Sequence, residues 1–568
     1  MIRPVLPACI ALLLAACGAN PDTGNDPGGD AALQAQTARG APMPETPPVP
    51  NETAAGQRIE ADVRHLADDR LEGRETGTPG YDLAADHVAA RFGAIGLQPA
   101  GDDGGWFQRV PLVRAVGLRD GATMEVTRNG RTIALRLGDQ FLPMPNFNAP
   151  ESTVSAPAVF VGQAIHAPEL QHDDFDGVDL HGRIAIVFGG APQRFADNPR
   201  AHYGSLRTKT EAVVARGAVG MVLVNTVDDE AGTPWARTAA QWDRPAMRLR
   251  GADGAPVDAP AQLQAMARVG AAAADLVFAD GPHNAAQLFA DARAGTLRPF
   301  ALPGTLTLAA RTRIDTLESR NVVARLPGRD PARAGEAVVQ TAHLDHIGTG
   351  APVDGDAIYN GALDNALGVA ILLEAAQLLA TADDAPARST VFAALTGEEQ
   401  GLLGAEWLAR HPPAGVRRMV ANLNIDMPIL TAPTRDIVAI GSAHSTLQAA
   451  VEQAAAEVGV DVSPDPFPEE VAFVRSDQYA FVRAGIPALY LDAGVTAANP
   501  GQEPKIAATW FLRNCYHQPC DQADLPIQYG DAARLAEVSA RITRIVGDAA
   551  DAPRWNAGDF FGERFGGR

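Results

Sequence analysis

The sequence predicts an α/β protein, in which a mixed, largely parallel sheet is flanked by helices and a small β-rich domain is inserted. Three observations indicate this. The chain has 568 residues, which is too long for one ordinary core. From about residue 320, strand-like runs alternate with helix-like stretches, as in "AVVQTAHLDH" followed by "DNALGVAILLEAAQLLA", and this alternation is typical of a parallel sheet. Between about 152 and 300 the chain instead carries short β-type runs, such as "DLHGRIAIVFGG" and "AVGMVLVN".

Residues 1–17 have the features of a lipoprotein signal peptide. Arg3 precedes an apolar run that is too short to span a membrane, and "LAAC" ends that run at Cys17. This tetrapeptide resembles a bacterial lipobox, in which the chain is cut before the cysteine and the cysteine is lipidated. The alternative is ordinary signal cleavage beside an incidental cysteine. Because Gly18 follows rather than aspartate, the resemblance implies an exported, lipid-anchored protein of the outer membrane, on its periplasmic face or at the cell surface.

The next segment, residues 18–55, is rich in Gly, Pro, Ala and Asp and poor in large apolar side chains, so we expect a flexible linker. Two helical patterns follow, separated by the turn-rich "EGRETGTPG". In the second pattern the apolar spacing predicts a buried helix face, made by Leu83, Val88, Phe92 and Ile95.

The charge and the missing motifs exclude several classes of function. The formal net charge of −21 argues against nucleic acid as a partner and favours an acidic, soluble exterior. The sequence contains no HExxH, GxSxG, P-loop or GxGxxG pattern, so neither a serine hydrolase nor a nucleotide-binding protein is indicated. It carries no signal for an oligomeric state.

Histidines and acids gather at the ends of the predicted strands. In a parallel sheet function sits at the carboxyl ends of the strands, so these side chains are candidates for one site. Taken singly, each is more simply a capping or hydrogen-bonded residue. Taken together, imidazole nitrogens and carboxylate oxygens suit Zn²⁺, and two ions a few Å apart would need a shared carboxylate. The set is His343, Asp345, Asp364, Glu398, Glu399, Asp426 and His517.

Two of these acids are adjacent in the chain. Glu398 and Glu399 stand in "VFAALTGEEQGLLGAEW", where an apolar strand ends and a helix begins. Like charges this close repel each other, so one carboxyl is expected to keep its proton unless a cation stands nearby. The pair therefore suggests a metal, acid–base chemistry, or a solvated first helical turn.

Of the four cysteines, Cys9 and Cys17 lie in the signal segment and Cys515 and Cys520 remain. An oxidising compartment favours a local disulfide between these last two. A thiolate metal site is the alternative, but two cysteines alone cannot complete a tetrahedral zinc site.

The motifs "AHLDH", "GALDNALG", "TGEEQGLLGA", "NIDM" and "YHQPCD" resemble, in order and approximate spacing, those of the two-zinc aminopeptidase family, which also includes glutamate carboxypeptidases and the transferrin-receptor ectodomain. The resemblance extends to "RSDQYAFVRAGIPA" and covers about residues 55–110 and 305–550. The stretches "GVDLHGRIAIVFGG" and "EAVVARGAVGMVLVN" resemble a protease-associated domain, a common accessory of this family. The implied division is a zinc-exopeptidase domain at 56–150 and 301–555, the insert at 151–300, and a C-terminal tail at 556–568.

The resemblance implies two Zn²⁺ ions with a shared ligand. His343, Asp364 and Asp426 would hold one ion, and Asp364, Glu399 and His517 would hold the other, so that Asp364 bridges them. A water or hydroxide would lie between the ions, which would lower its pKa and polarise the scissile carbonyl.

Further residues would take other roles in such a site. Glu398 would be the general base that passes the water's proton to the leaving amine. Tyr516 would stabilise the tetrahedral oxyanion, or would only pack there. Asp345 would hydrogen-bond His343 and fix its tautomer. Arg475, in "RSDQ", would contact substrate or form a structural ion pair, and a disulfide across "CYHQPC" would brace the loop.

His346 departs from the family pattern, which often has a small or polar residue at this place. We interpret it as a group that supports the ligands from outside rather than as a ligand. The expected function is that of a metal-dependent exopeptidase, an aminopeptidase acting on peptides. The alternatives are a glutamate-carboxypeptidase-like enzyme, a single-zinc glutaminyl cyclase, or a surface protein that binds without chemistry. The presence of both His343 and Asp426 weakens the cyclase alternative.

Overall fold

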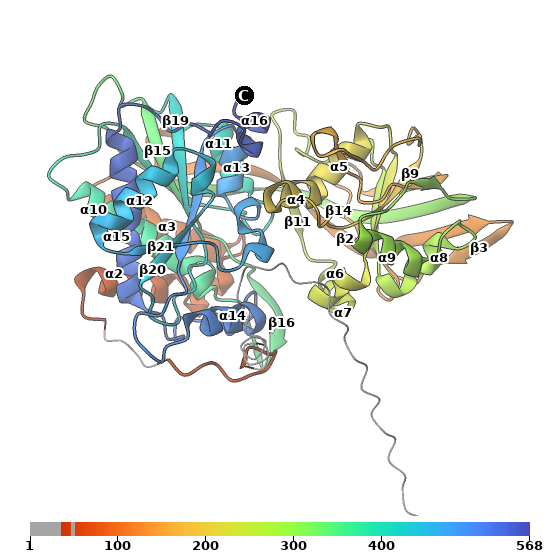
Figure 1. Cartoon of the computed structure of the whole chain (residues 1–568), viewed down its shortest axis with the longest axis horizontal. Coiled ribbons are helices and arrows are strands. Elements are labelled where there is room, and N and C mark those ends of the chain that lie inside the picture. Colours follow the sequence, from red (N-terminus) through yellow and green to blue (C-terminus); the bar gives the residue numbers. More distant parts are fainter. Residues whose placement is uncertain (1–33, 35, 47–50, 568) are drawn as a thin grey trace, which may run out of the picture.

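A computed structural model describes residues 34, 36–46 and 51–567, arranged in two lobes (Figure 1). Two long antiparallel strands, β2 (Phe107–Arg128) and β14 (Thr305–Leu326), run from one lobe into the other. The insert therefore leaves and rejoins the larger lobe through a paired ribbon. The signal peptide and Cys17 lie outside the described residues.

The larger lobe is built on a mixed sheet with the strand order β11-β2-β14-β18-β15-β19-β22-β20-β21. The central pairs, β15 with β18, β15 with β19 and β19 with β22, are parallel, whereas β14 and β20 join the sheet antiparallel. This confirms the predicted α/β class with its largely parallel core. The remaining bounds are β11 (Ala246–Leu249), β15 (Glu336–His343), β18 (Ser389–Leu395), β19 (Arg418–Ile425), β20 (Asp436–Ile440), β21 (Asp461–Ser463) and β22 (Ala488–Ala493).

Helices cover both faces of this sheet. Because successive residues of a strand point to opposite faces, Val338 of β15 packs in one apolar cluster and Val339 in another. The first cluster lies under α2 (Ala54–Leu66), α3 (Pro79–Ile95), α10 (Leu367–Ala380), α12 (Leu447–Val458) and α15 (Tyr529–Asp548). The second lies under α11 (Leu403–Arg410), α13 (Gln478–Arg483) and α16 (Phe560–Phe565).

One helix among the described residues, Ala362–Ala380, is long and apolar enough to cross a membrane by length and composition. It includes α10, and 89% of the apolar window is buried inside the protein. It packs against α2 and α15, as a core helix does.

Helix α3 forms where the sequence predicts a helix, but one residue that was expected on its buried face, Leu83, is exposed. Thr78 caps the first turn by accepting a hydrogen bond from the Tyr81 N–H, and Pro79 opens the helix. Val88 and Phe92 are buried, whereas Leu83 is 52% exposed. Leu83 is neither three nor four residues from Val88, so it falls off the stripe that faces the core.

The smaller lobe has its own sheet, in the order β13-β6-β9-β10-β12-β4. Its inner strands are parallel: β6 (Ala158–Phe160), β9 (Ile184–Phe188), β10 (Gly220–Val224) and β12 (Ala265–Val269). The edge strands β4 (Phe141–Met144) and β13 (Phe300–Ala301) are antiparallel. The insert's sheet thus begins ahead of residue 151, because β4 pairs with β12, while β11 from the middle of the insert joins the larger sheet.

Both ends of the described chain are more ordered than the composition indicates. In the expected linker, the Gly40 N–H donates to Asn514 Oδ1 at 2.7 Å, and Trp510 Nε1 donates to the Ala41 carbonyl at 2.8 Å. This part of the linker therefore packs on α14 (Pro504–Asn514). The expected C-terminal tail contains α16, whose Phe561 is fully buried. Hydrogen bonds to α14 hold the first segment and apolar packing of Phe561 holds the second, and the local composition of the sequence indicates neither.

Candidate metal centre

Three adjacent parallel strands bring their carboxyl ends together at one edge of the sheet. Strand β15 ends at His343, and Asp426 directly follows β19. The loop after β18 carries Glu398 and Glu399. Asp364 lies in the turn before α10, and His517 in the loop after α14. The topology therefore gathers the side chains that the sequence singled out.

The first group of candidate ligands surrounds His343. Its Nε2 lies 2.9 Å from Asp426 Oδ1 and 3.3 Å from Asp364 Oδ1. All three side chains are at least largely buried, and their ligand atoms lie within 4.8 Å of one another. This is the first ligand set that the resemblance implies.

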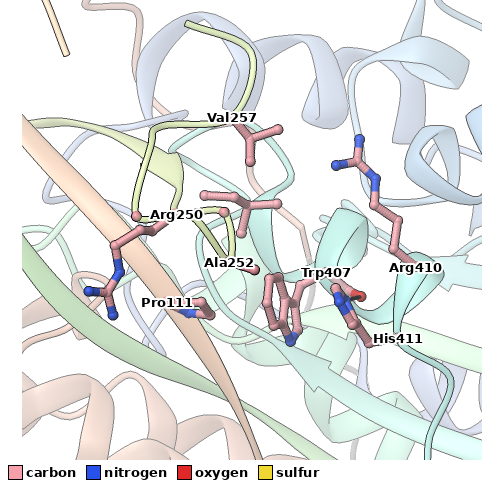
Figure 2. Close-up of a pocket in the computed structure, with 10 residues that line it drawn as sticks. Pro111, Arg250, Ala252, Val257, Trp407, Arg410 and His411 are labelled. Carbon is pink, nitrogen blue, oxygen red and sulfur yellow. Dashed lines mark hydrogen bonds between the residues drawn. The ribbon is translucent and has the colours of Figure 1, made fainter. Parts of the chain in front are cut away.

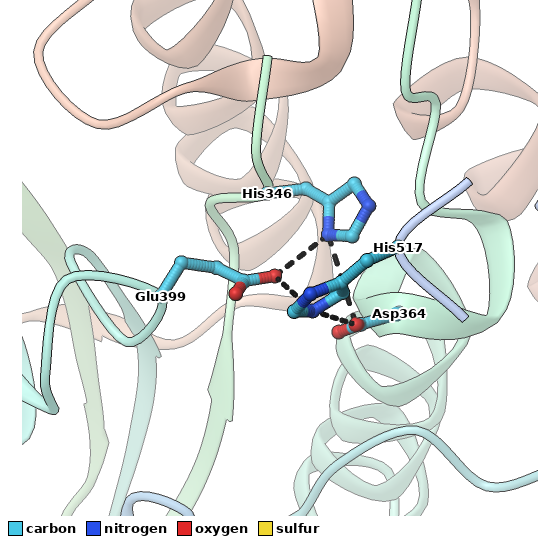
Figure 3. Close-up of side chains that lie close together, drawn as sticks. All are labelled: His346, Asp364, Glu399 and His517. Carbon is cyan, nitrogen blue, oxygen red and sulfur yellow. Dashed lines mark hydrogen bonds and ion pairs between the residues drawn. The ribbon is translucent and has the colours of Figure 1, made fainter. Parts of the chain in front are cut away.

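The second group uses the other oxygen of the same aspartate (Figure 3). His517 Nε2 lies 3.2 Å from Asp364 Oδ2 and 3.2 Å from Glu399 Oε1. His346 Nδ1 also faces this group, 2.8 Å from Glu399 Oε1. Asp364 thus presents Oδ1 to one group and Oδ2 to the other, as a bridging carboxylate would.

The two adjacent glutamates have carboxyl groups with opposite pKa shifts. Burial raises the pKa of Glu398 well above its ordinary value, and the nearby charges of Asp426 and Glu399 add to this. Burial also acts to raise the pKa of Glu399, but the charge of His517 and the hydrogen bonds from His517 and His346 outweigh it and lower that pKa. The carboxylate of Glu398 therefore binds a proton more readily than that of Glu399, which stays ionised.

The two groups of candidate ligands favour positive charge on the histidines among them. Burial lowers the pKa of His343, but the charges of Asp426 and Glu398 raise it well above its ordinary value. Burial likewise opposes protonation of His517, yet the Glu399 charge and the hydrogen bond with Asp364 bring its pKa to about 10. A cation among these acids would be stabilised in the same way.

The donor set itself fits zinc. It combines histidine nitrogens with carboxylate oxygens, and their spacing leaves room for an ion rather than for a packed core. Cobalt or manganese can occupy ligands of the same type.

Asp345 supports the centre with both its backbone and its side chain. His343 Nδ1 hydrogen-bonds the backbone carbonyl of Asp345 at 3.0 Å and not the Asp345 carboxylate. That carboxylate instead accepts from the Thr76 hydroxyl at 2.9 Å and from the N–H groups of Glu398 and Glu399 at 3.1 and 3.4 Å. The implied hydrogen bond between Asp345 and His343 is therefore present through the backbone of Asp345, while the side chain turns toward the glutamate loop.

Tyr516 lies beside the second group, whereas Arg475 pairs with Glu470 outside it. The ring of Tyr516 lies 4.0 Å from that of His517, centroid to centroid. Arg475 Nη1 makes a partly exposed ion pair with Glu470 Oε2 at 2.8 Å, which is the structural alternative for this residue. Cys515 and Cys520 form a disulfide on either side of Tyr516 and His517.

Three further residues belong to the site, and the sequence analysis missed them. Fully buried Arg74 donates to the carbonyls of Asn360 and Gly361 at 2.6 and 3.0 Å, in the loop that leads to the bridging aspartate. Asp521 accepts from the N–H of Asp364 at 3.0 Å. Asp477 is completely buried, and neither carboxylate oxygen has a hydrogen-bond partner among the described residues. It lies in the "RSDQ" stretch, which the analysis used only for its arginine.

A separate hollow of about 490 Å³ lies between the insert and α11 (Figure 2). Trp407, Arg410 and His411 line it from the larger lobe, and Arg250 and Val257 line it from the insert. None of the candidate ligands lines it, so it is not the metal centre.

Two parts of the chain match models of known protein families. Residues 321–543 match the model of Peptidase family M28, and residues 150–257 match that of the PA domain. Leupeptin-inactivating enzyme 1 of Streptomyces exfoliatus is 28% identical over 206 residues, which are 35% of this chain and 42% of that protein. A probable zinc metalloprotease of Pyrenophora teres f. teres is 39% identical over 107 residues, 19% of this chain and 22% of that protein. The chain thus spans less than half the length of these curated relatives.

A solved structure shares the fold over nearly the whole molecule. It is the aminopeptidase from Aneurinibacillus sp. strain AM-1, with a TM-score of 0.51 and 20% sequence identity. The match covers 88% of this chain and 98% of that one. At this identity the likeness concerns the fold alone.

Proposed function

We propose that the chain is a member of peptidase family M28 with an inserted PA domain, and that it is a zinc-dependent aminopeptidase that removes N-terminal residues from peptides. The observation that carries the proposal is the pair of ligand groups that share Asp364, with Glu398 beside them. Asp364 Oδ1 faces His343 at 3.3 Å, and its Oδ2 faces His517 at 3.2 Å.

In this proposal the site holds two zinc ions. His343, Asp364 and Asp426 would hold one, and Asp364, Glu399 and His517 would hold the other. Zinc bound there supplies Lewis-acid chemistry, which acidifies a water molecule and polarises the scissile carbonyl.

Glu398 acts as the general base. Its carboxylate takes a proton from the attacking water and then donates that proton to the leaving amine. Burial raises the pKa of Glu398, which helps it to hold the proton between these two steps. The N–H of Glu398 is fixed by Asp345 Oδ1 at 3.1 Å, so the base starts from a defined backbone position.

Tyr516 donates a hydrogen bond from its phenolic hydroxyl to the oxyanion of the tetrahedral intermediate, and the closeness of its ring to that of His517, 4.0 Å between centroids, supports this role. Burial raises the pKa of Tyr516 well above its ordinary value, and the charges of Asp364 and Glu399 add to this. The hydroxyl therefore stays protonated and available as a donor. Arg475, on the same side of the site, contacts the substrate beyond its pair with Glu470.

We also propose that the protein is exported, lipid-anchored at Cys17 and located at the outer membrane. The "LAAC" segment and the Gly that follows it support this. Mass spectrometry of the membrane-extracted protein tests it. A diacylated or triacylated cysteine at the new N-terminus is expected, and an unmodified N-terminus elsewhere would contradict it.

The activity is tested with the purified mature chain, from residue 18 onward, on a panel of aminoacyl-nitroanilides and on the same compounds with a blocked amino group. We expect cleavage of the free-amine compounds only, loss of cleavage with a zinc chelator, and its return with added zinc. Cleavage of C-terminal glutamate from blocked peptides would favour the carboxypeptidase alternative. Two bound zinc ions without turnover of any substrate would favour a binding protein.

A further inference from the structure

We infer that His346 is a fourth protein ligand of the ion that Asp364, Glu399 and His517 would hold, so that the two metal positions are unequal. This inference rests on the proposed metal centre and goes beyond the ligand set that the family resemblance implies. It replaces our interpretation of His346 as a support from outside.

The distances among the four side chains match a tetrahedral zinc site (Figure 3). Four ligand atoms about 2.0–2.1 Å from one zinc ion lie about 3.3 Å from one another. His517 Nε2 lies 3.2 Å from both Asp364 Oδ2 and Glu399 Oε1. His346 Nδ1 lies 2.8 Å from Glu399 Oε1 and 3.8 Å from Asp364 Oδ2. These separations bracket the tetrahedral value.

The atoms that His346 faces distinguish a ligand from an outside support. A histidine that only oriented Glu399 would bond its Oε2, the oxygen turned away from the other ligands. His346 Nδ1 instead faces Oε1, the same oxygen that faces His517 Nε2. Both imidazoles therefore converge on the space that an ion would fill.

The surroundings hold the imidazole of His346 in this orientation. Its side chain is completely buried, and its backbone N–H donates to the Arg74 carbonyl at 3.2 Å. The ring lies against Gly361, where a Cβ atom would come within 2.6 Å of the ring carbon Cγ. Its Nε2 has no hydrogen-bond partner within the described part of the chain, so Nδ1 makes the polar contacts of this ring.

As a consequence, the two metal positions differ in their number of protein ligands: one has four and is closed to water, and the other has three and is open to it. Four protein ligands complete the tetrahedral shell typical of structural zinc sites, whereas catalytic zinc sites keep three protein ligands and an open place. The His346 position is then closed. The His343 position, with Asp364 and Asp426, keeps room for water. The closed position should bind its ion more tightly and fill first.

The test uses the metal-free mature chain loaded with one equivalent of zinc. X-ray absorption at the zinc edge counts the imidazoles around the ion, and titration against a competing chromophoric chelator gives both affinities. We expect two imidazoles in the unmodified protein and one in His346→Ser. That variant should lose at least about tenfold in the tighter affinity, with the weaker one unchanged. His181→Ser, at an exposed position of the insert, is the matched control.

One imidazole in the unmodified protein, or two unchanged affinities in a folded His346→Ser variant, would overturn this inference while leaving the proposed peptidase intact. Circular dichroism establishes that the variant is folded. If the unmodified protein binds no zinc, both the inference and the proposed function fall. If it binds zinc as inferred but cleaves no peptide, only the proposed function falls.

Discussion

Asp345 Oδ1 accepts a hydrogen bond from the backbone N–H of Glu398 at 3.1 Å. The aspartate follows the strand that ends in His343, whereas the glutamate follows the neighbouring strand. One buried carboxylate therefore sets the position of the loop that carries both glutamates relative to the first ligand. This relationship explains how two adjacent acids can take different tasks.

Asp345→Asn should lower kcat by about 10- to 100-fold without removing the metal. The asparagine amide would face the Glu399 N–H and the Thr76 hydroxyl, which now donate to the carboxylate. Steady-state kinetics and zinc content by atomic absorption check this. Thr76→Val is the comparison variant: it removes the hydroxyl that donates to Asp345 and accepts from the Gly397 N–H at 3.1 Å, keeps the carboxylate itself, and should have a smaller effect. Loss of zinc from Asp345→Asn would contradict the loop-positioning role.

Glu398→Gln and Glu399→Gln should lose activity for different reasons. The first should lose about 10²- to 10⁴-fold in kcat, because it removes the general base, and should keep its zinc. The second should lose affinity for zinc, because it removes a ligand. Measuring both activity and zinc content separates the two. Equal loss of zinc in both variants would show that the roles are not divided.

The double variant Cys515→Ser/Cys520→Ser should weaken zinc binding and lower the free energy of unfolding by about 2 kcal/mol, because the disulfide closes a short loop. That loop carries Tyr516 and His517. Urea unfolding and zinc titration measure the two effects, and reducing agent applied to the unmodified protein should reproduce them. Unchanged zinc affinity would mean that the loop keeps its shape without the bridge.

Arg207 joins the insert to the larger lobe through Glu406. The carboxylate of Glu406 is 4% exposed; Arg207 from the insert pairs with it, and Arg483 Nη1 lies 2.6 Å from it. Arg207→Ala should lower the free energy of unfolding by about 2–3 kcal/mol, since a buried charge loses one of its partners. Arg410→Ala, whose pair with Glu406 is longer at 3.4 Å and more exposed, should cost less than about 1 kcal/mol. Equal effects would contradict this ranking.

His202 should make the protein less stable in acid. Burial lowers the pKa of His202 to about 3, well below its ordinary value of 6.5. The unfolded chain therefore takes up a proton that the folded chain does not, and stability falls as the pH drops from about 6.5 toward 3. His202→Gln should show a shallower loss over that range, measured by urea unfolding at several pH values. His181→Gln, which is exposed, should behave like the unmodified protein.

The fold could be predicted from the sequence where the signal is local, and so could the gathering of the candidate ligands at one edge of the sheet. Strand and helix alternation is visible in short windows, and His343 and Asp426 stand directly where β15 and β19 end. The family resemblance then assigned roles that no single residue could establish.

The missed residues act through the backbone of distant segments. Arg74 donates to the carbonyls of Leu344 and Gly361, which only the folded chain brings near it. Asp521 reaches the Asp364 N–H in the same way. Neither the periodicity of apolar residues nor the spacing of motifs in the sequence indicates such contacts. The burial of Phe561 has a similar cause, because it depends on packing between distant elements, whereas Leu83 is exposed because it falls off the apolar stripe of α3.

A crystal structure of the zinc-loaded protein, with data collected at the zinc absorption edge, tests the central claim most directly. The account predicts two anomalous peaks, both contacted by Asp364. His343 and Asp426 should contact one, Glu399 and His517 the other, and the carboxylate of Glu398 should ligate neither. A single peak, or Glu398 as a ligand, would contradict the division of tasks between the two adjacent glutamates.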